Sequence, residues 1–174
     1  MTKEELGALI KEVALLKGEF TLRSGRKSKY YFDKYLFETK PEVLAPLTKE
    51  LAKLLPPLDS FSRLAGPELG AVALVTALSL EVKKPFIIVR KAEKQYGTSK
   101  MMEGEIFKGE KVVMVEDILT TAGAAIAGAD KLKQSGIDVL LLIGVLDREE
   151  GARENIEAAG YRYKALFTKS ELGL

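Results

Sequence analysis

The chain has 174 residues, of which 47% are hydrophobic, so it is long enough for a single domain with one sizeable core. A formal charge of +2 is too small to indicate a nucleic-acid partner or a membrane surface. The sequence has no cysteine and no histidine, which excludes disulfides, cysteine nucleophiles and a histidine-based catalytic triad. No apolar run reaches the roughly 18 residues that span a bilayer, and the N-terminus is charged, so we expect a cytoplasmic protein.

The first forty residues predict a helix followed by a hairpin. Thr2 and Glu5 have the spacing of a capping box, and the helix that they begin should end near Gly18. Residues 18–33 then alternate as a strand, a basic turn and an aromatic strand, which indicates a hairpin. We expect this hairpin to lie outside the main sheet, as a hood over the ends of its strands.

From residue 41 onward, helices alternate with short apolar strands. The predicted helices cover 41–55, 71–80, 123–134 and 152–159, and the predicted strands cover 61–65, 85–90, 112–115, 139–146 and 163–167. This alternation predicts an α/β fold with a mostly parallel sheet and helices on both faces. Residues 91–104 hold many charges and few large aliphatic side chains, so we expect a long mobile loop there. We therefore predict one domain, with a hood over roughly 1–40 and a core over 41–174.

The stretch from Val112 to Gly123 is organised like a binding site. Four apolar residues predict a strand buried on both faces, and Glu116 and Asp117 follow where that strand should end. Two threonines and several small residues then lead into a helix, so that backbone amides and the helix N-terminus can surround an anion. Ligands bind at such strand ends in parallel sheets. The pattern predicts a phosphate site beside acids that hold sugar hydroxyls or a metal.

The adjacent acids of that stretch would repel each other at the end of a buried strand. Glu116 and Asp117 therefore require a compensating cation, hydroxyl groups or nearby amides. Because of this requirement, the pair is harder to explain as solvent-exposed surface charge than the other charged residues of the chain.

Other candidate segments have an ordinary structural explanation as well as a functional one. The two glycines of the Gly66–Gly70 loop suit close approach to an anion, but they equally suit a strand-to-helix turn. Arg148, taken alone, is better explained by a salt bridge with Glu149 or Glu150. The basic residues from Arg90 to Lys94 are typical of a solvated loop. The aromatic residues 30–32 are typical of strand packing.

Several stretches resemble one protein family. Residues 112–124 resemble the phosphoribosyl pyrophosphate signature of type I phosphoribosyltransferases, in which an apolar run, two acids, two apolar residues, threonine and a small-residue loop follow one another. Residues 20–33 resemble the N-terminal hood of the orotate phosphoribosyltransferase family. Arg90 and Lys91, with Lys94, Gly97 and Thr98 after them, resemble its mobile catalytic loop, and 146–151 resemble its orotate-contacting strand end. The resemblance covers nearly the whole chain in the same order and spacing, and it implies the type I phosphoribosyltransferase fold.

The resemblance also implies roles for individual residues. Glu116 and Asp117 would hold the ribose hydroxyls of the donor, and the loop from Thr120 to Ala124 would wrap its 5-phosphate. Arg148 would pair with the orotate carboxylate, for which a guanidinium fork is geometrically suited. The implied catalytic residues are Lys94, Asp117 and Glu116. The implied substrate-binding residues are Lys27, Tyr31, Phe32, Glu68, Leu69, Arg90, Lys91, Lys94, Tyr96, Glu116, Asp117, Ile118, Leu119, Thr120, Thr121, Ala122, Gly123, Ala124 and Arg148.

The reaction implied by the resemblance is a magnesium-dependent transfer of the phosphoribosyl group to orotate in pyrimidine biosynthesis. The products would be orotidine 5′-phosphate and pyrophosphate, with Mg²⁺ bound mainly through the donor pyrophosphate. In this family Lys91 and Lys94 act across a subunit interface, so a homodimer with shared active sites is implied.

The chain departs from the family pattern at three positions. Tyr96 stands where the mobile loop usually carries histidine, so that position can donate a hydrogen bond but cannot carry a positive charge. Ala122 and Ala124 stand where glycine and a hydroxyl residue are common. An alanine at 122 predicts that the backbone keeps a negative φ there, and an alanine at 124 removes one phosphate-binding hydroxyl.

Three other classes of protein compete with this interpretation. A purine phosphoribosyltransferase would share the signature, but it would have no need of residues 20–28 or Arg148. A non-catalytic regulator that binds phosphoribosyl pyrophosphate would typically lose the loop lysines, and both Lys91 and Lys94 are present. A generic Rossmann-type nucleotide binder would require a Gly-x-Gly-x-x-Gly motif, which the sequence lacks.

Overall fold

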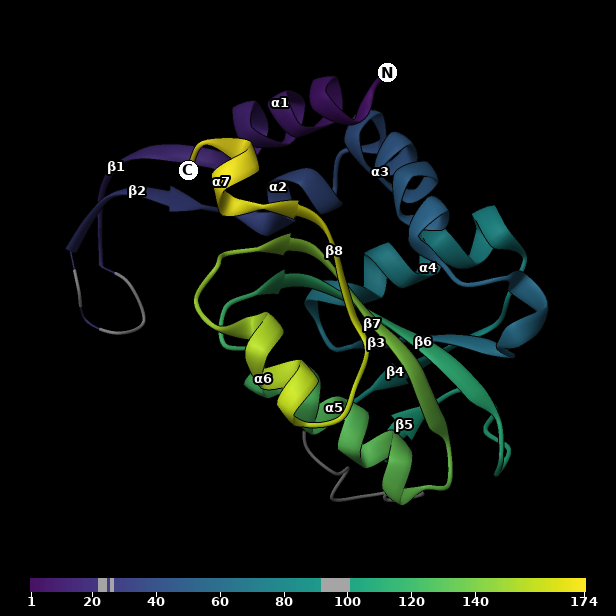
Figure 1. Cartoon of the computed structure of the whole chain (residues 1–174). Coiled ribbons are helices and arrows are strands. Elements are labelled where there is room, and N and C mark those ends of the chain that lie inside the picture. Colours follow the sequence, from purple (N-terminus) through teal and green to yellow (C-terminus); the bar gives the residue numbers. More distant parts are fainter. Residues whose placement is uncertain (22–24, 26, 92–100) are drawn as a thin grey trace.

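The computed structural model of the chain describes residues 1–21, 25, 27–91 and 101–174. Within these residues, six strands form one sheet in the order β5-β4-β3-β6-β7-β8 (Figure 1). The strands are β3 (Arg63–Pro67), β4 (Phe86–Val89), β5 (Met102–Glu103), β6 (Lys111–Leu119), β7 (Asp138–Asp147) and β8 (Tyr163–Thr168). Neighbouring strands are parallel except at the β4–β5 edge, which is antiparallel. The predicted mostly parallel α/β sheet is confirmed.

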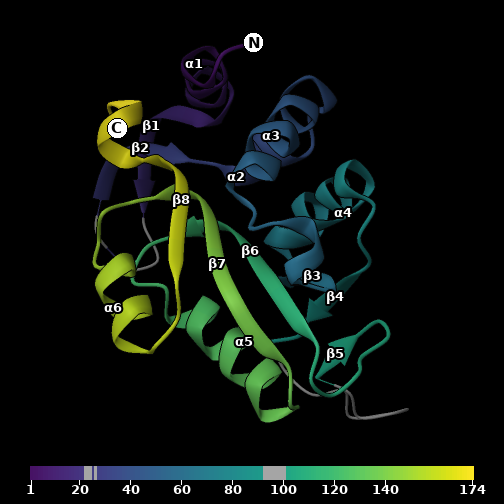
Figure 2. The same cartoon turned by 45° about the vertical axis from the view of Figure 1, so that its right-hand side comes forward.

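Helices cover both faces of this sheet (Figure 2). Helices α3 (Pro41–Leu54) and α4 (Gly70–Val82) lie on one face, and α5 (Gly123–Gln134) and α6 (Ala152–Ala158) lie on the other. Because side chains alternate along a strand, Val113 and Val115 of β6 join the hydrophobic cluster of the first face, and Val112 and Met114 join that of the second. This double burial explains why the apolar run of β6 is continuous rather than alternating.

The hood is built from both ends of the chain (Figure 1). Its elements are α1 (Lys3–Ala14), β1 (Leu15–Thr21), β2 (Lys27–Phe32), α2 (Lys34–Glu38) and, from the C-terminus, α7 (Lys169–Leu172). The predicted capping box is confirmed, because the amide of Glu5 donates to Thr2 Oγ1 at 3.1 Å and the amide of Thr2 donates to Glu5 Oε2 at 2.7 Å. Strands β1 and β2 pair as the predicted antiparallel hairpin, separate from the main sheet.

Two predicted element boundaries are wrong, one at the end of helix α1 and one at the end of strand β6. Helix α1 ends at Ala14 rather than near Gly18, because Leu15 and Leu16 pair with the second strand of the hairpin. Strand β6 continues through Glu116 and Asp117 to Leu119, because β7 runs beside it and supplies partners as far as Asp147. The two acids therefore lie within the strand rather than after it.

Besides the short 3₁₀ helix at Leu58–Ser60, three short elements of the described residues were not predicted. The segment expected to be a loop over 91–104 contains strand β5, which pairs with the end of β4, while residues 92–100 lie outside the described residues. Helix α2 lies in the hood, and helix α7 follows the last strand. The signal for α7 was present in the sequence, since Thr168 and Glu171 form a second capping box.

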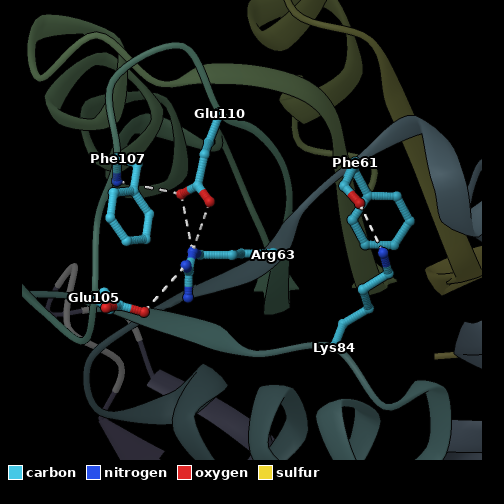
Figure 3. Close-up of polar contacts among 6 residues, drawn as sticks. All are labelled: Phe61, Arg63, Lys84, Glu105, Phe107 and Glu110. Atoms are coloured by element: carbon cyan, nitrogen blue, oxygen red, sulfur yellow. Dashed lines mark hydrogen bonds and ion pairs between the residues drawn. The ribbon is translucent and has the colours of Figure 1, made fainter.

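A charged cluster joins segments at the amino ends of the strands (Figure 3). Arg63, at the start of β3, donates through Nε to Glu110 at 2.8 Å and contacts Glu105 through Nη2 at 3.5 Å. Its guanidinium also lies 5.3 Å from the ring centre of Phe107. Nearby, Lys84 Nζ donates to the carbonyl of Phe61 at 3.0 Å. These contacts hold the connections that lead into β3, β4 and β6.

No helix in the described part of the chain combines the length and the apolar character that a membrane span requires.

Candidate active site

A cavity of about 600 Å³ opens at the carboxyl ends of β3, β4 and β6. Segments 67–70, 89–91 and 116–125 line it, together with Lys34 and Tyr35 from the hood and Ala127, Gly128 and Lys131 from α5. The structure thus brings most of the predicted donor-site residues to one place. Those that line the cavity are Glu68, Leu69, Arg90, Lys91, Glu116, Asp117, Ile118, Leu119, Thr120, Thr121, Ala122, Gly123 and Ala124.

The two signature acids have the compensating groups that the sequence required. Asp117 is buried, and one of its carboxylate oxygens forms an ion pair with the ammonium of Lys34, while the other accepts the amide of Ile118. Glu116 Oε1 accepts the amide of Asp117 at 3.2 Å. The cation therefore comes from the hood helix α2. Lys34 was not singled out in the sequence, because nothing local indicates that its side chain reaches β6.

A third carboxyl group belongs to the same cluster. Glu38, on α2, is only 2% exposed, and its Oε1 has no hydrogen-bond partner among the described residues. Burial and the nearby charge of Asp117 raise the pKa of Glu38 to about 8. Burial and the same charge raise the pKa of Glu116 well above its usual range. Burial works to lower the pKa of Lys34, but the hydrogen bond and charge of Asp117 outweigh it, so that this pKa is raised.

The predicted phosphate loop connects β6 to α5 and contains one strained residue. Ala122 has a φ of +61° and forms the N-cap of α5, so the prediction of a negative φ is wrong. The sharp reversal from strand to helix requires a left-handed residue here, and a side chain in that conformation costs roughly 1–2 kcal/mol. The loop is also tied to α6, because Asn155 Nδ2 donates to the carbonyl of Thr121 at 3.0 Å. Asn155 is a further residue that the sequence did not single out.

The predicted pyrophosphate residues are held mainly through the backbone. The amide of Lys91 donates to Glu68 Oε1 at 2.8 Å, and Arg90 Nη1 lies 3.8 Å from Glu68 Oε2. The peptide bond between Glu68 and Leu69 is cis. From the opposite side, Lys131 Nζ donates to the carbonyls of Arg90 and Lys91 at 2.9 and 3.0 Å. Lys131 therefore links α5, which begins at the phosphate loop, to the end of β4.

The predicted acceptor residues are not assembled in this cavity. Lys27 is exposed and donates to Thr21 Oγ1 at 2.8 Å. The ring of Tyr31 lies 5.7 Å from that of Phe20, and Phe32 packs against the core. The Nε of Arg148 lies 3.1 Å from Glu150 Oε1, which is the salt bridge that we considered for it.

These four side chains, Lys27, Tyr31, Phe32 and Arg148, are absent from the cavity lining in the described part of the chain. Lys94 and Tyr96 lie outside the described residues. The substrate contacts of all six residues stay predictions.

The fold and this site define a class of protein, and comparison with known proteins gives the same class. The model of the phosphoribosyl transferase domain matches residues 60–162 of the chain. An orotate phosphoribosyltransferase from Methanocella arvoryzae is 46% identical over 97% of this chain and 95% of its own length.

Solved structures extend this likeness over the hood. A crystal structure of Mycobacterium tuberculosis H37Rv orotate phosphoribosyltransferase, in complex with Fe(III) dicitrate, has a TM-score of 0.86 and 31% identity, with 99% of each chain covered. Another structure of that enzyme, in complex with 5-phospho-alpha-D-ribosyl 1-diphosphate, has a TM-score of 0.83 and 29% identity over the same shares. The chain belongs to the orotate phosphoribosyltransferase family, whose members are pentosyltransferases.

Proposed function

We propose that this chain transfers the phosphoribosyl group from phosphoribosyl pyrophosphate to N1 of orotate, in the formation of pyrimidine nucleotides. The observation that supports this proposal is the convergence of three donor-binding segments on one cavity. The acids of β6, the phosphate loop before α5 and the Glu68–Arg90 region come from separate parts of the sequence and line the same space. Family membership supplies the identity of the acceptor.

In the proposed reaction, N1 of orotate forms the new bond to the anomeric carbon of the donor as the bond to pyrophosphate breaks. The pyrophosphate leaves with the electron pair, and the N1 proton passes to water. Glu116 and Asp117 hold the ribose hydroxyls, and the amides and hydroxyls of residues 120–124 bind the 5-phosphate at the N-terminus of α5. Arg90, Lys91 and Lys94 stabilise charge on the leaving pyrophosphate, which is the main electrostatic requirement of the step.

Magnesium is the proposed metal of this reaction. The described residues contain no group of three or more acidic side chains that could hold a metal ion by themselves. Mg²⁺ commonly binds through substrate phosphates with few protein ligands, so the cavity is compatible with an ion that enters with the donor. When bound, Mg²⁺ would neutralise charge on the pyrophosphate.

We further propose that the enzyme is a cytoplasmic homodimer with shared sites. The resemblance to a family in which the residues corresponding to Lys91 and Lys94 act across a subunit interface supports the dimer. The multiply charged donor supports a cytoplasmic location, because such an anion does not cross a bilayer unaided.

The activity is tested by incubating the protein with Mg²⁺ and phosphoribosyl pyrophosphate and following the loss of orotate absorbance. Adenine, hypoxanthine and uracil serve as competing acceptors. We expect turnover with orotate alone, and removal of Mg²⁺ by a chelator should abolish it. Turnover of a purine without turnover of orotate would contradict the proposal.

The shared site is tested by mixing two inactive variants. Lys94→Ala and Asp117→Asn should each lose activity as homodimers. If Lys94 completes the site of the neighbouring subunit, mixed dimers contain one intact site, and mixing after partial dissociation should restore part of the activity. Failure of every mixture to regain activity, although mixed dimers form, would contradict the sharing.

A further inference from the structure

A lysine of the hood reaches the donor site. Lys34 is the first residue of α2, and its ammonium pairs with Asp117 of β6, 83 residues further along the chain. The Asp117 side chain is 3% exposed and that of Lys34 is 29% exposed, so the pair is shielded on the acid's side and open towards the cavity on the lysine's side. Lys34 itself lines the cavity.

The N-terminus of α4 leaves room for this pair. A Cβ atom added at Gly70 would overlap the Asp117 carboxylate and would lie 2.5 Å from Lys34 Nζ. Asp117 can move little, because it is buried and its second oxygen is bound by the amide of Ile118. Any larger residue at position 70 would therefore displace the pair. Segments from the hood, from α4 and from β6 are thus fitted to one ammonium–carboxylate contact.

Lys34 also supplies the positive charge in a cluster of three carboxyl groups. The carboxyl groups of Glu38 and Glu116 accompany Asp117, while Lys34 is the cation that the structure pairs with Asp117. Removal of the ammonium would leave three carboxyl groups in a poorly solvated space, and among the described residues no other ion pair supplies Asp117 with a cation. Such a cluster relieves its repulsion by taking up protons or by turning side chains away from one another. Either change would spoil Asp117 as an acceptor for ribose hydroxyls.

We propose that Lys34 is a positioning residue of the donor site, which holds the Asp117 carboxylate in place beside the cavity and thereby couples the hood to ribose binding. This inference rests on the proposed function for the identity of the ligand. It separates Lys34 from the lysines of the pyrophosphate loop, because Lys34 acts through Asp117 rather than on the leaving group. It also predicts that ribose recognition depends on Lys34 while recognition of the 5-phosphate, which residues 120–124 provide, does not.

The test measures the binding of two probes by calorimetry. Lys34→Met should weaken the binding of phosphoribosyl pyrophosphate about tenfold or more, the usual effect of losing a hydrogen bond to a charged group. Binding of inorganic phosphate should stay unchanged, and Lys34→Arg should restore most of the donor affinity. In steady-state kinetics, the KM for the donor should rise more than kcat falls. Lys49→Met is the matched control, since Lys49 is exposed on α3.

A second variant disturbs the Lys34–Asp117 contact by a substitution in α4. Gly70→Ala keeps both charged residues but forces them apart. It should therefore also weaken the binding of phosphoribosyl pyrophosphate and leave the binding of inorganic phosphate unchanged. Donor binding by Lys34→Met that is as tight as in the native chain, or tighter, would overturn the inference, as would equal loss of donor and phosphate binding. A native chain that binds no phosphoribosyl pyrophosphate would instead contradict the proposed function itself.

Discussion

Strands β3 and β6 have a charged cluster at each end of the sheet, and only the cluster at the carboxyl end adjoins a cavity. At the amino end, one buried guanidinium, that of Arg63, lies between Glu105 and Glu110, and its contacts close the loops against each other (Figure 3). At the carboxyl end, the ammonium of Lys34 faces three carboxyl groups, the pKa values of Glu38 and Glu116 are raised, and a cavity adjoins them. The first cluster is arranged for stability. In the second, the ion pair of Lys34 and Asp117 borders a cavity that can take a ligand.

Substitution of Asp117 should have the largest effect, and it should fall on catalysis. Asp117→Asn removes a charged acceptor for the ribose hydroxyls and leaves Lys34 without its counter-charge, so kcat/KM for the donor should fall about 100-fold or more. Its thermal midpoint should change little. Asp138→Asn, at an exposed position at the amino end of β7, is the control and should keep full activity. Near-native activity of Asp117→Asn would contradict the assignment of the carboxyl-end cluster to donor binding.

The amino-end cluster should show the reverse behaviour. Arg63→Met leaves Glu110 largely buried without its partner, and the free energy of unfolding should fall by about 3 kcal/mol. Donor KM and kcat should stay close to native at temperatures where the variant is folded. Chemical denaturation measures the first quantity and steady-state assays measure the second. Arg162→Met, at an exposed position before β8, should change neither.

The raised pKa of Glu38 predicts a pH dependence of stability. Because the folded chain holds this proton up to a pH of about 8, the carboxyl stabilises the fold below its unfolded pKa, and this contribution is lost as pH rises through about 8. Glu38→Gln mimics the protonated form. The native chain should lose about 2 kcal/mol of unfolding free energy between pH 6 and pH 9 through this group, and the Glu38→Gln variant should not show that loss.

Unfolding titrations at both pH values measure this loss, with Glu42→Gln, at an exposed position, as the control. Parallel pH profiles for Glu38→Gln and the native chain would show that Glu38 is not the group responsible.

The smallest predicted effect concerns the strained phosphate loop of the carboxyl end. Ala122→Gly should raise the unfolding free energy by about 0.5–1 kcal/mol, because glycine adopts a positive φ without strain. Ala124→Gly, in the first turn of α5, should instead lower it by a similar amount. Denaturation of the two variants side by side measures the contrast, and a loss of stability in both would argue against strain at Ala122.

The donor half of the site was largely predictable, and the acceptor half was not. Residues 116–124 form the end of a strand, a loop and the start of a helix, so their sequence order already places them together. Glu68 and Arg90 follow strands that must end on the same edge of a parallel sheet. Lys27, Tyr31 and Phe32 belong to a hairpin with its own two-stranded sheet. The local sequence predicts that hairpin but does not specify how it packs, and within the described residues these side chains stay outside the cavity.

The sequence by itself determined the strand-helix alternation, the signature on β6 and the family, because periodicity and contiguous motifs are local properties of the chain. Only the tertiary structure decided that Lys34 pairs with Asp117 above Gly70, that Glu38 joins the cluster, and that Lys131 and Asn155 anchor the loops. These contacts join residues far apart in the chain. They depend on the angle at which the hood and α5 pack against the sheet, which no local pattern encodes.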